Sequence, residues 1–126
     1  MSVATATPLK SQPSSPRLSR ILFEPFRDAE QAWFWTCNAL RARRDGARSE
    51  GTGVRRPCDP DDVLRALDRL YRNRRIDLEH ARVLRIWGER QSPPDLFRTR
   101  EYTAAVLWRE ALERLEWPLR EKGIVE

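Results

Sequence analysis

Arginine side chains supply most of the chemistry that this sequence offers. The chain has 126 residues and 24 basic side chains, all but two of them arginine, and its formal net charge is +5. A guanidinium group binds a phosphate through two parallel hydrogen bonds and also stacks on nucleobases. Residues 41–90 alone account for a net charge of +5. This concentration favours a polyanionic partner, although a GC-rich genome that encodes Arg at most basic positions is an equally good explanation of the excess.

We expect DNA contacts at two places in the chain, the end of the second predicted helix and the start of the last one. Both places offer side chains that bind phosphates or base edges. The candidate nucleic-acid-binding residues are Arg72, Arg74, Arg75, Arg98, Arg100, Tyr102 and Thr103. The cluster at 72–75 has a second interpretation, because cations at the C-terminal end of a helix also stabilise its dipole.

Enzymatic and metal chemistry lack a recognisable pattern. The possible soft or imidazole ligands are Cys37, Cys58 and His80, which fall on three separate predicted elements without the paired spacing of zinc sites. A single histidine and the lack of a G-x-S-x-G motif give no activated nucleophile. We therefore predict a protein that is not an enzyme, with no cofactor, no metal and no small-molecule substrate. The two thiols are expected to be free, and His80 is expected to cap a helix or lie at the surface.

Helical periodicity dominates the chain after residue 20 and predicts an all-α fold, a small orthogonal bundle of four or five helices. The predicted helices span about 28–44, 59–75, 78–87 and 100–122. The residues expected to end them are the N-caps Asp28, Asp59, Asp77 and Thr99 and the C-cap Gly123. The predicted core consists of Trp33, Trp87 and Trp108 with Leu67, Leu70, Leu84 and Leu112, and Leu78 is also expected to point inward.

The first twenty residues differ in composition from the rest. They contain three prolines, five serines and three basic residues but no acidic residue. Such a segment buries too little apolar area to offset its chain entropy, so residues 1–20 are predicted to be a disordered basic arm and 21–126 a single helical domain. The arm lacks the apolar segment of a secretory signal, and no apolar run approaches the roughly 18–20 residues of a membrane span. We therefore expect a cytoplasmic protein with no membrane association.

The order of features in residues 77–119 resembles the sigma-factor region-4-like helix-turn-helix of small phage and prophage transcription regulators. The matching features are the acidic cap Asp77, the helix with Ala81, Leu84 and Trp87, the turn glycine Gly88 and the amphipathic run 108–112. The resemblance implies a DNA-binding unit whose recognition positions fall on Arg98, Arg100, Tyr102 and Thr103. The family has a full middle helix, whereas residues 91–97 contain Pro93 and Pro94 and allow one helical turn at most.

Two functions follow from these observations. The first is a small, non-enzymatic, transcription-associated protein that binds DNA through phosphate contacts and has a helix-turn-helix-like C-terminal half. The alternative is a protein–protein adaptor that uses exposed aromatic residues of the first helix, Phe34 and Trp35, or the Glu/Arg face of the last helix. The placement of Trp35 distinguishes them, because an exposed indole among apolar neighbours is typical of a protein interface.

Overall fold

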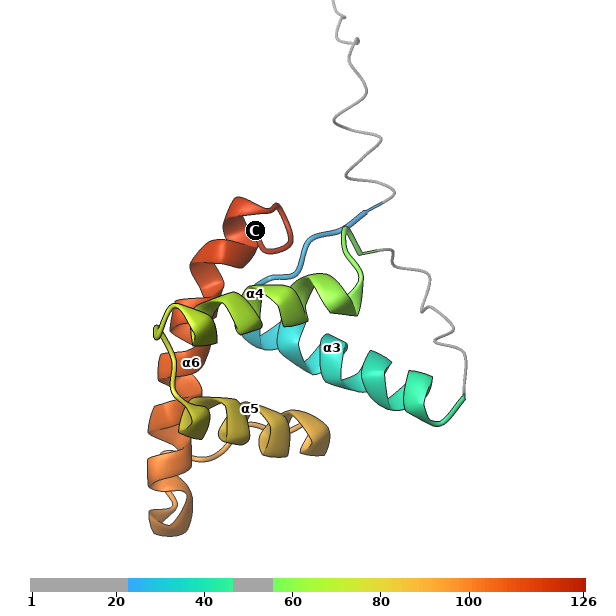
Figure 1. The fold of residues 1–126 in the computed structure, drawn as a ribbon. Helices are drawn as coiled ribbons and strands as arrows, with labels where there is room; N and C mark the ends of the chain where they lie inside the picture. The colour runs from blue at the N-terminus through green and yellow to red at the C-terminus, as the bar shows by residue number, and fades with distance from the viewer. Residues whose placement is uncertain (1–22, 47–55) are drawn as a thin grey trace, which may run out of the picture.

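Four α-helices form the body of the protein in the computed structural model, which describes residues 23–46 and 56–126. They are α3 (Ala29–Arg44), α4 (Pro60–Arg72), α5 (Leu78–Arg90) and α6 (Tyr102–Glu121), and a short 3₁₀ helix, η2 (Thr99–Glu101), precedes α6. Figure 1 shows α6 running across the other three helices, which lie roughly side by side. The prediction of a small all-α bundle is confirmed. The predicted arm, residues 1–20, lies outside the described residues.

Short-range hydrogen bonds fix the starts of three helices where the sequence predicts them. The side chain of Asp28 accepts a hydrogen bond from the Gln31 amide at 2.9 Å. The Asp59 amide donates to the Asp62 carboxylate at 2.8 Å, and the Asp77 amide donates to His80 Nδ1 at 2.9 Å. Each bond satisfies an amide that the first turn of a helix leaves unpaired. His80 therefore has the capping role, in a buried position.

The predicted start of the last helix was wrong. Thr99 opens η2 instead of capping α6, which begins at Tyr102. The cause is a turn around Asp95, whose carboxylate accepts a hydrogen bond from the Phe97 amide at 2.9 Å. The Asp95 amide in turn donates to the Glu101 carboxylate at 2.8 Å. These contacts tighten residues 95–101 into a turn and a 3₁₀ segment before the α-helix starts.

The core lies between α3, α4, α5 and α6 and contains most, but not all, of the predicted residues. Trp33, Leu84, Trp108 and Leu112 are buried as predicted, together with Phe26, Val63, Leu115 and Leu119. The predicted core residues that prove to be half-buried at its margin are Leu67, Leu70 and Trp87. The prediction for Leu78 was wrong, since its side chain is 52% exposed. It lines a groove between α3, α4 and α5 that no helix of the described residues covers.

Gly88 is an interior residue of α5 and not the turn glycine that the helix-turn-helix resemblance implies. The helix continues past it to Arg90. A Cβ atom at Gly88 would lie 2.5 Å from Cys37 Sγ and 2.6 Å from Trp33 Nε1. The indole of Trp33 is itself held by a hydrogen bond from Nε1 to the Leu84 carbonyl at 2.8 Å. The glycine thus allows α3 and α5 to approach closely.

The two ends of the described domain are joined by a short parallel bridge. The Phe26 amide donates to the Ile124 carbonyl at 2.8 Å, and the Glu126 amide donates to the Phe26 carbonyl at 2.9 Å. Gly123 has a φ of 76° and reverses the chain after α6, as its predicted C-cap role requires. The bridge buries Phe26, Ile124 and Val125 over the end of α6.

Candidate nucleic-acid interface

A groove between the end of α4 and the second half of α6 is lined by charged side chains that are mainly basic. We call it the basic groove and define it by the four guanidinium groups that line it, those of Arg69, Arg74, Arg75 and Arg114. Its remaining wall includes Leu70, Asn73, Trp117 and Pro118, and its one carboxylate is Glu113. The groove has a volume of about 690 Å³. Four cations facing one anion create a field that attracts a polyanion.

The end of α4 presents two of these arginines through its own backbone geometry. The Arg74 amide donates to the Tyr71 carbonyl at 3.0 Å, and the Arg75 amide donates to the Leu70 carbonyl at 2.8 Å. This is the hydrogen-bond pattern of a Schellman motif, which requires a left-handed residue. That residue is Arg74, with a φ of 58°, at a position where glycine is the usual choice. The left-handed conformation costs a non-glycine residue about 1 kcal/mol, so arginine at this position lowers the stability of the protein relative to glycine.

Helix α6 supplies the opposite wall and holds the loop in place. Arg114 Nη1 donates to the Arg75 carbonyl at 3.1 Å, which ties the end of α4 to the middle of α6. The i, i+4 spacing of Glu110 and Arg114 predicts an ion pair between them, but Glu110 accepts a hydrogen bond from His80 Nε2 at 2.9 Å instead. Because Nδ1 of His80 accepts from the Asp77 amide, the proton lies on Nε2. Glu110 thus has its partner on α5, while Arg114 lines the groove.

The guanidinium groups of the groove have no carboxylate partner within the described residues. Seven of the 18 arginines in that part of the chain lie within 4.0 Å of a carboxylate oxygen, but none of the four groove arginines does. Unpaired and solvent-exposed guanidinium groups are available for phosphate oxygens. Most arginines of the described residues therefore have no carboxylate within ion-pair distance.

Trp117 adds an aromatic surface to the groove. Its side chain is 62% exposed and lies beside the groove arginines, with Pro118 next to it. An exposed indole among cations provides a face on which a nucleobase stacks, as in proteins that bind single strands. The combination of arginines with an open tryptophan distinguishes this groove from an ordinary basic surface.

The seven residues predicted to bind nucleic acid separate into two groups. Arg74 and Arg75 line the basic groove, and Arg72 lies at its edge in a 3.0 Å ion pair with Asp68. The other four residues lie around the start of α6, where Arg98 pairs with Asp95 at 3.7 Å and Arg100, Tyr102 and Thr103 are exposed. Eleven residues separate Thr103 from Arg114, which is about 16 Å along a helix. The structure therefore does not form a single site from all seven.

Arg69, Arg114 and Trp117 are the groove residues that the sequence reasoning missed. Arg69 precedes the 72–75 cluster by less than one turn of α4, so its proximity to that cluster was readable from the sequence. Arg114 and Trp117 are three residues apart on one side of α6, and this side flanks the buried residues Leu115 and Leu119. Their meeting with α4 depends on how the two helices cross, which local sequence patterns do not specify.

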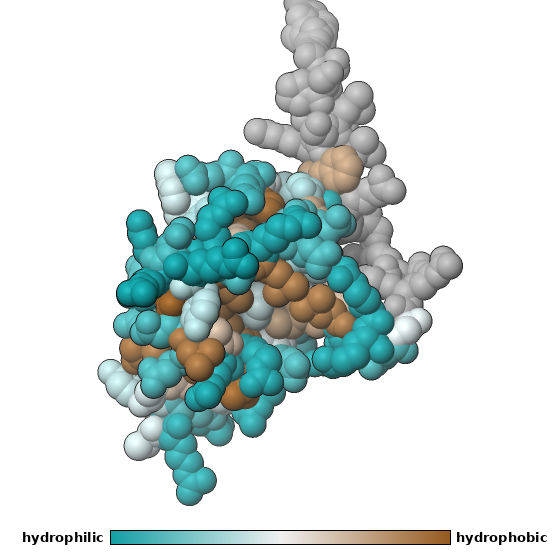
Figure 2. All heavy atoms as spheres, in the orientation of Figure 1, coloured by the Kyte–Doolittle hydropathy of each residue, from teal (hydrophilic) through white to brown (hydrophobic). Residues whose placement is uncertain are grey.

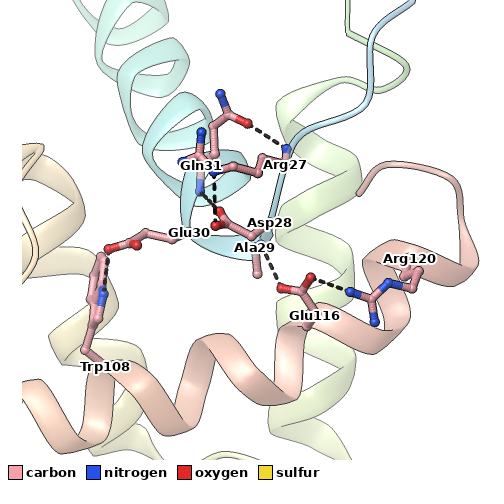
Figure 3. A network of polar contacts seen from close by, with 8 residues as sticks. All are labelled: Arg27, Asp28, Ala29, Glu30, Gln31, Trp108, Glu116 and Arg120. Carbon is pink, nitrogen blue, oxygen red and sulfur yellow. Dashed lines mark hydrogen bonds and ion pairs between the residues drawn. The ribbon is translucent and has the colours of Figure 1, made fainter. Parts of the chain in front are cut away.

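The carboxylates on the side of the molecule where α3 meets α6 have structural partners (Figure 3). Glu116 Oε1 accepts a hydrogen bond from the Ala29 amide at 2.9 Å, and its Oε2 accepts from Arg120 at 2.8 Å. Glu30 accepts from the indole of Trp108 at 3.2 Å. These bonds join the start of α3 to α6. Among residues 23–46 and 56–126, no three or more Cys, His, Asp or Glu side chains come close enough to hold a metal ion.

The aromatic residues proposed for an adaptor are not exposed on α3. Trp35 is half-buried with its ring centroid 5.1 Å from that of Phe26. Phe34 is also half-buried, with its ring centroid 5.4 Å from that of Trp108. These rings therefore help to pack the domain, and α3 does not present the exposed aromatic pair that the adaptor alternative places on it.

The two thiols are free, and their surroundings favour the protonated form. Burial raises the pKa of Cys37 from 9.0 to about 12, with a further contribution from Glu89. Burial likewise raises the pKa of Cys58 to about 11, with Asp62 and Asp59 adding to the shift. A thiol that stays protonated is a poor nucleophile and a poor metal ligand.

The raised thiol pKa values predict that the protein loses stability as the pH rises above about 9. The unfolded chain releases these protons near the ordinary cysteine pKa, whereas the native state holds them to higher pH, so unfolding becomes more favourable with increasing pH. Urea unfolding at pH 8 and pH 10.5 measures the effect. Because tyrosines and lysines also titrate in this range, Cys37→Ala is the control. An equal decline in that variant would show that Cys37 is not responsible.

Comparison of the chain with protein-family models, with curated proteins and with solved structures finds no match. Within the described residues, none of the helices has both the length and the apolar character needed to cross a bilayer.

Proposed function

We propose that this is a small, non-enzymatic, transcription-associated protein that binds DNA through the basic groove. The observation that supports the proposal is the convergence on one groove of four arginines that have no carboxylate partner among the described residues. They come from α4, from the turn that follows it and from α6, and the groove holds a single carboxylate. In this proposal the guanidinium groups of Arg74, Arg75 and Arg114 contact phosphate oxygens, and Arg69 adds to the local field. These contacts position the DNA without reading its sequence.

In this proposal two other features contact the bases. Trp117 would stack on an unpaired or splayed base at the groove. Arg100, Tyr102 and Thr103 would reach a duplex that extends along α6, since about 16 Å corresponds to roughly five base pairs at 3.4 Å each. Binding at the groove alone is then sequence-independent, and any specificity comes from the start of α6.

Salt titration of DNA binding tests the proposal directly. Fluorescence anisotropy of a labelled duplex, measured between 50 and 300 mM KCl, is expected to give a slope of log K against log salt of about −3 to −4, because each neutralised phosphate contributes about −0.9. Arg75→Gln should reduce the magnitude of the slope by about 1 and weaken binding alike on unrelated sequences.

A matched control lies on the same helix as Arg114. Arg109 is exposed on α6 but lines a different hollow, which contains several carboxylates. Arg109→Gln removes the same charge from the protein and should leave the slope unchanged. Failure to bind at 50 mM KCl would refute the proposed function, and equal effects of Arg75→Gln and Arg109→Gln would refute the assignment to the basic groove.

A further inference from the structure

A second groove, apolar instead of basic, lies between α3, α4 and α5. We call it the apolar groove and define it by the side chains that line its floor and walls, which are Trp33, Cys37, Leu40, Leu64, Leu67, Leu78 and Ala81. Figure 2 shows hydrophobic atoms open to the surface between α4 and α5, with hydrophilic atoms on either side. Its volume is about 450 Å³, and it shares no lining residue with the basic groove. Exposed apolar surface of this kind marks interaction sites in folded proteins.

The shape of the apolar groove follows from helical spacing on two of its walls. On α3 the lining residues run from Trp33 to Arg44, and on α5 they run from Leu78 to Glu89. Each stretch contains twelve residues and extends about 16 Å along its helix axis, which is three helical turns. A groove of this length between helices matches the apolar face of one further short helix.

The border of the apolar groove is positively charged. Its charged lining residues are Arg44, Arg82 and Arg85, against a single carboxylate, that of Glu89. The ion pair between Arg44 Nη1 and Glu89 Oε2 is long, at 3.9 Å. Arg82 and Arg85 have no carboxylate within 4.0 Å in the part of the chain described. A basic border beside an apolar floor selects a ligand with apolar groups flanked by negative charge.

We infer that the apolar groove binds an acidic amphipathic helix of about three turns from a partner protein. Leucine-like side chains at i, i+3, i+4 and i+7 would occupy the floor around Leu64, Leu67 and Leu78. Glutamate or aspartate residues beside that stripe would face Arg82 and Arg85. The inference does not depend on the proposed DNA binding, because the two grooves use different residues.

Charge reversal on α5 provides the decisive test. The probe is a labelled synthetic peptide of about four helical turns with a leucine stripe flanked by glutamates, and the matched peptide carries lysines in place of the glutamates. The full chain is expected to bind the acidic peptide at least 10-fold more tightly than the basic one in fluorescence anisotropy. The double substitution Arg82→Glu with Arg85→Glu should reverse this preference, and both residues are exposed, so the fold should tolerate the change.

Two controls separate the apolar groove from general charge effects. Arg69→Glu with Arg75→Glu removes the same charge at the basic groove and should leave acidic-peptide binding within about 2-fold while reducing DNA binding. Leu78→Glu places a carboxylate in the groove at an exposed position and should weaken the acidic peptide at least 10-fold. Equal binding of the two peptides would overturn the inference. So would sedimentation showing that Leu78→Glu abolishes self-association of the chain, because the occupant would then be a second copy.

Discussion

Gly88→Ala is expected to destabilise the protein by about 1–2 kcal/mol, a net value in which an overpacking cost of about 2–3 kcal/mol outweighs a gain of about 1 kcal/mol in helix propensity. The new methyl group would lie 2.5 Å from Cys37 Sγ and 2.6 Å from Trp33 Nε1, distances that neither atom tolerates. Trp33 cannot turn aside without losing its hydrogen bond to the Leu84 carbonyl. Thermal unfolding followed by circular dichroism should show a melting temperature lower by about 5–15 °C.

Two variants test the steric cause. Gly123→Ala changes a glycine with open space around it and a φ of 76°, so it should cost only the left-handed penalty of about 1 kcal/mol. Cys37→Ala combined with Gly88→Ala removes one of the two clashing atoms and should recover part of the loss, which a double-mutant cycle measures. A Gly88→Ala protein as stable as the wild type would mean that α3 and α5 do not approach each other as the structure has them.

The parts of the fold that the sequence predicted are those that depend on nearby residues. Asp28, Asp59 and Asp77 bond to amides or side chains three residues away, so their capping roles are visible in the sequence. The buried face of α6 repeats at helical spacing through Trp108, Leu112 and Leu115, for the same reason. The start of α6 was mispredicted because a carboxylate six residues away, Glu101 acting on Asp95, decides where the helix begins.

The parts that the sequence did not predict depend on contacts between distant residues. Gly88 in the sequence is equally compatible with a turn and with a helix interior, and only the proximity of α3 selects the second. Phe26 pairs with the tail around Ile124 through backbone hydrogen bonds that no side-chain pattern encodes. The same limit applies to the candidate site: Arg74 and Arg75 are neighbours in sequence, whereas Arg114 joins them because α6 crosses the end of α4.

Helix α4 is the element that links the two proposed surfaces. Arg69 and Leu70 face the basic groove on one side, while Leu64 and Leu67 face the apolar groove on the other. A predicted core residue that is half-buried, such as Leu67, is therefore placed at a surface instead of in the centre. The amphipathic pattern of α4 indicates which of its residues are apolar. It does not show that part of this apolar face lines a groove open to solvent.

Replacing Arg74 by glycine is expected to have two effects of opposite sign. Glycine adopts the left-handed conformation without strain, so Arg74→Gly should stabilise the protein by about 1 kcal/mol. The same change removes a guanidinium group from the basic groove and should weaken DNA binding about 5- to 10-fold at low salt, with a slope in log salt smaller by about 1. Chemical denaturation measures the first effect and anisotropy titration the second.

Two substitutions separate backbone strain from charge. Arg74→Gln keeps a non-glycine residue in the left-handed backbone conformation but removes the charge, so it should weaken DNA binding as Arg74→Gly does and leave stability near that of the wild type. Gln91 also has a φ of 58°, and its side-chain Nε2 donates hydrogen bonds to the Phe34 and Gly88 carbonyls at 3.0 and 2.9 Å. Gln91→Gly relieves the same strain but loses these bonds, so it should gain less stability than Arg74→Gly, and DNA binding should not change. If Arg74→Gly is more stable and binds DNA as well as the wild type, Arg74 has no part in phosphate binding, and its strained position needs another explanation.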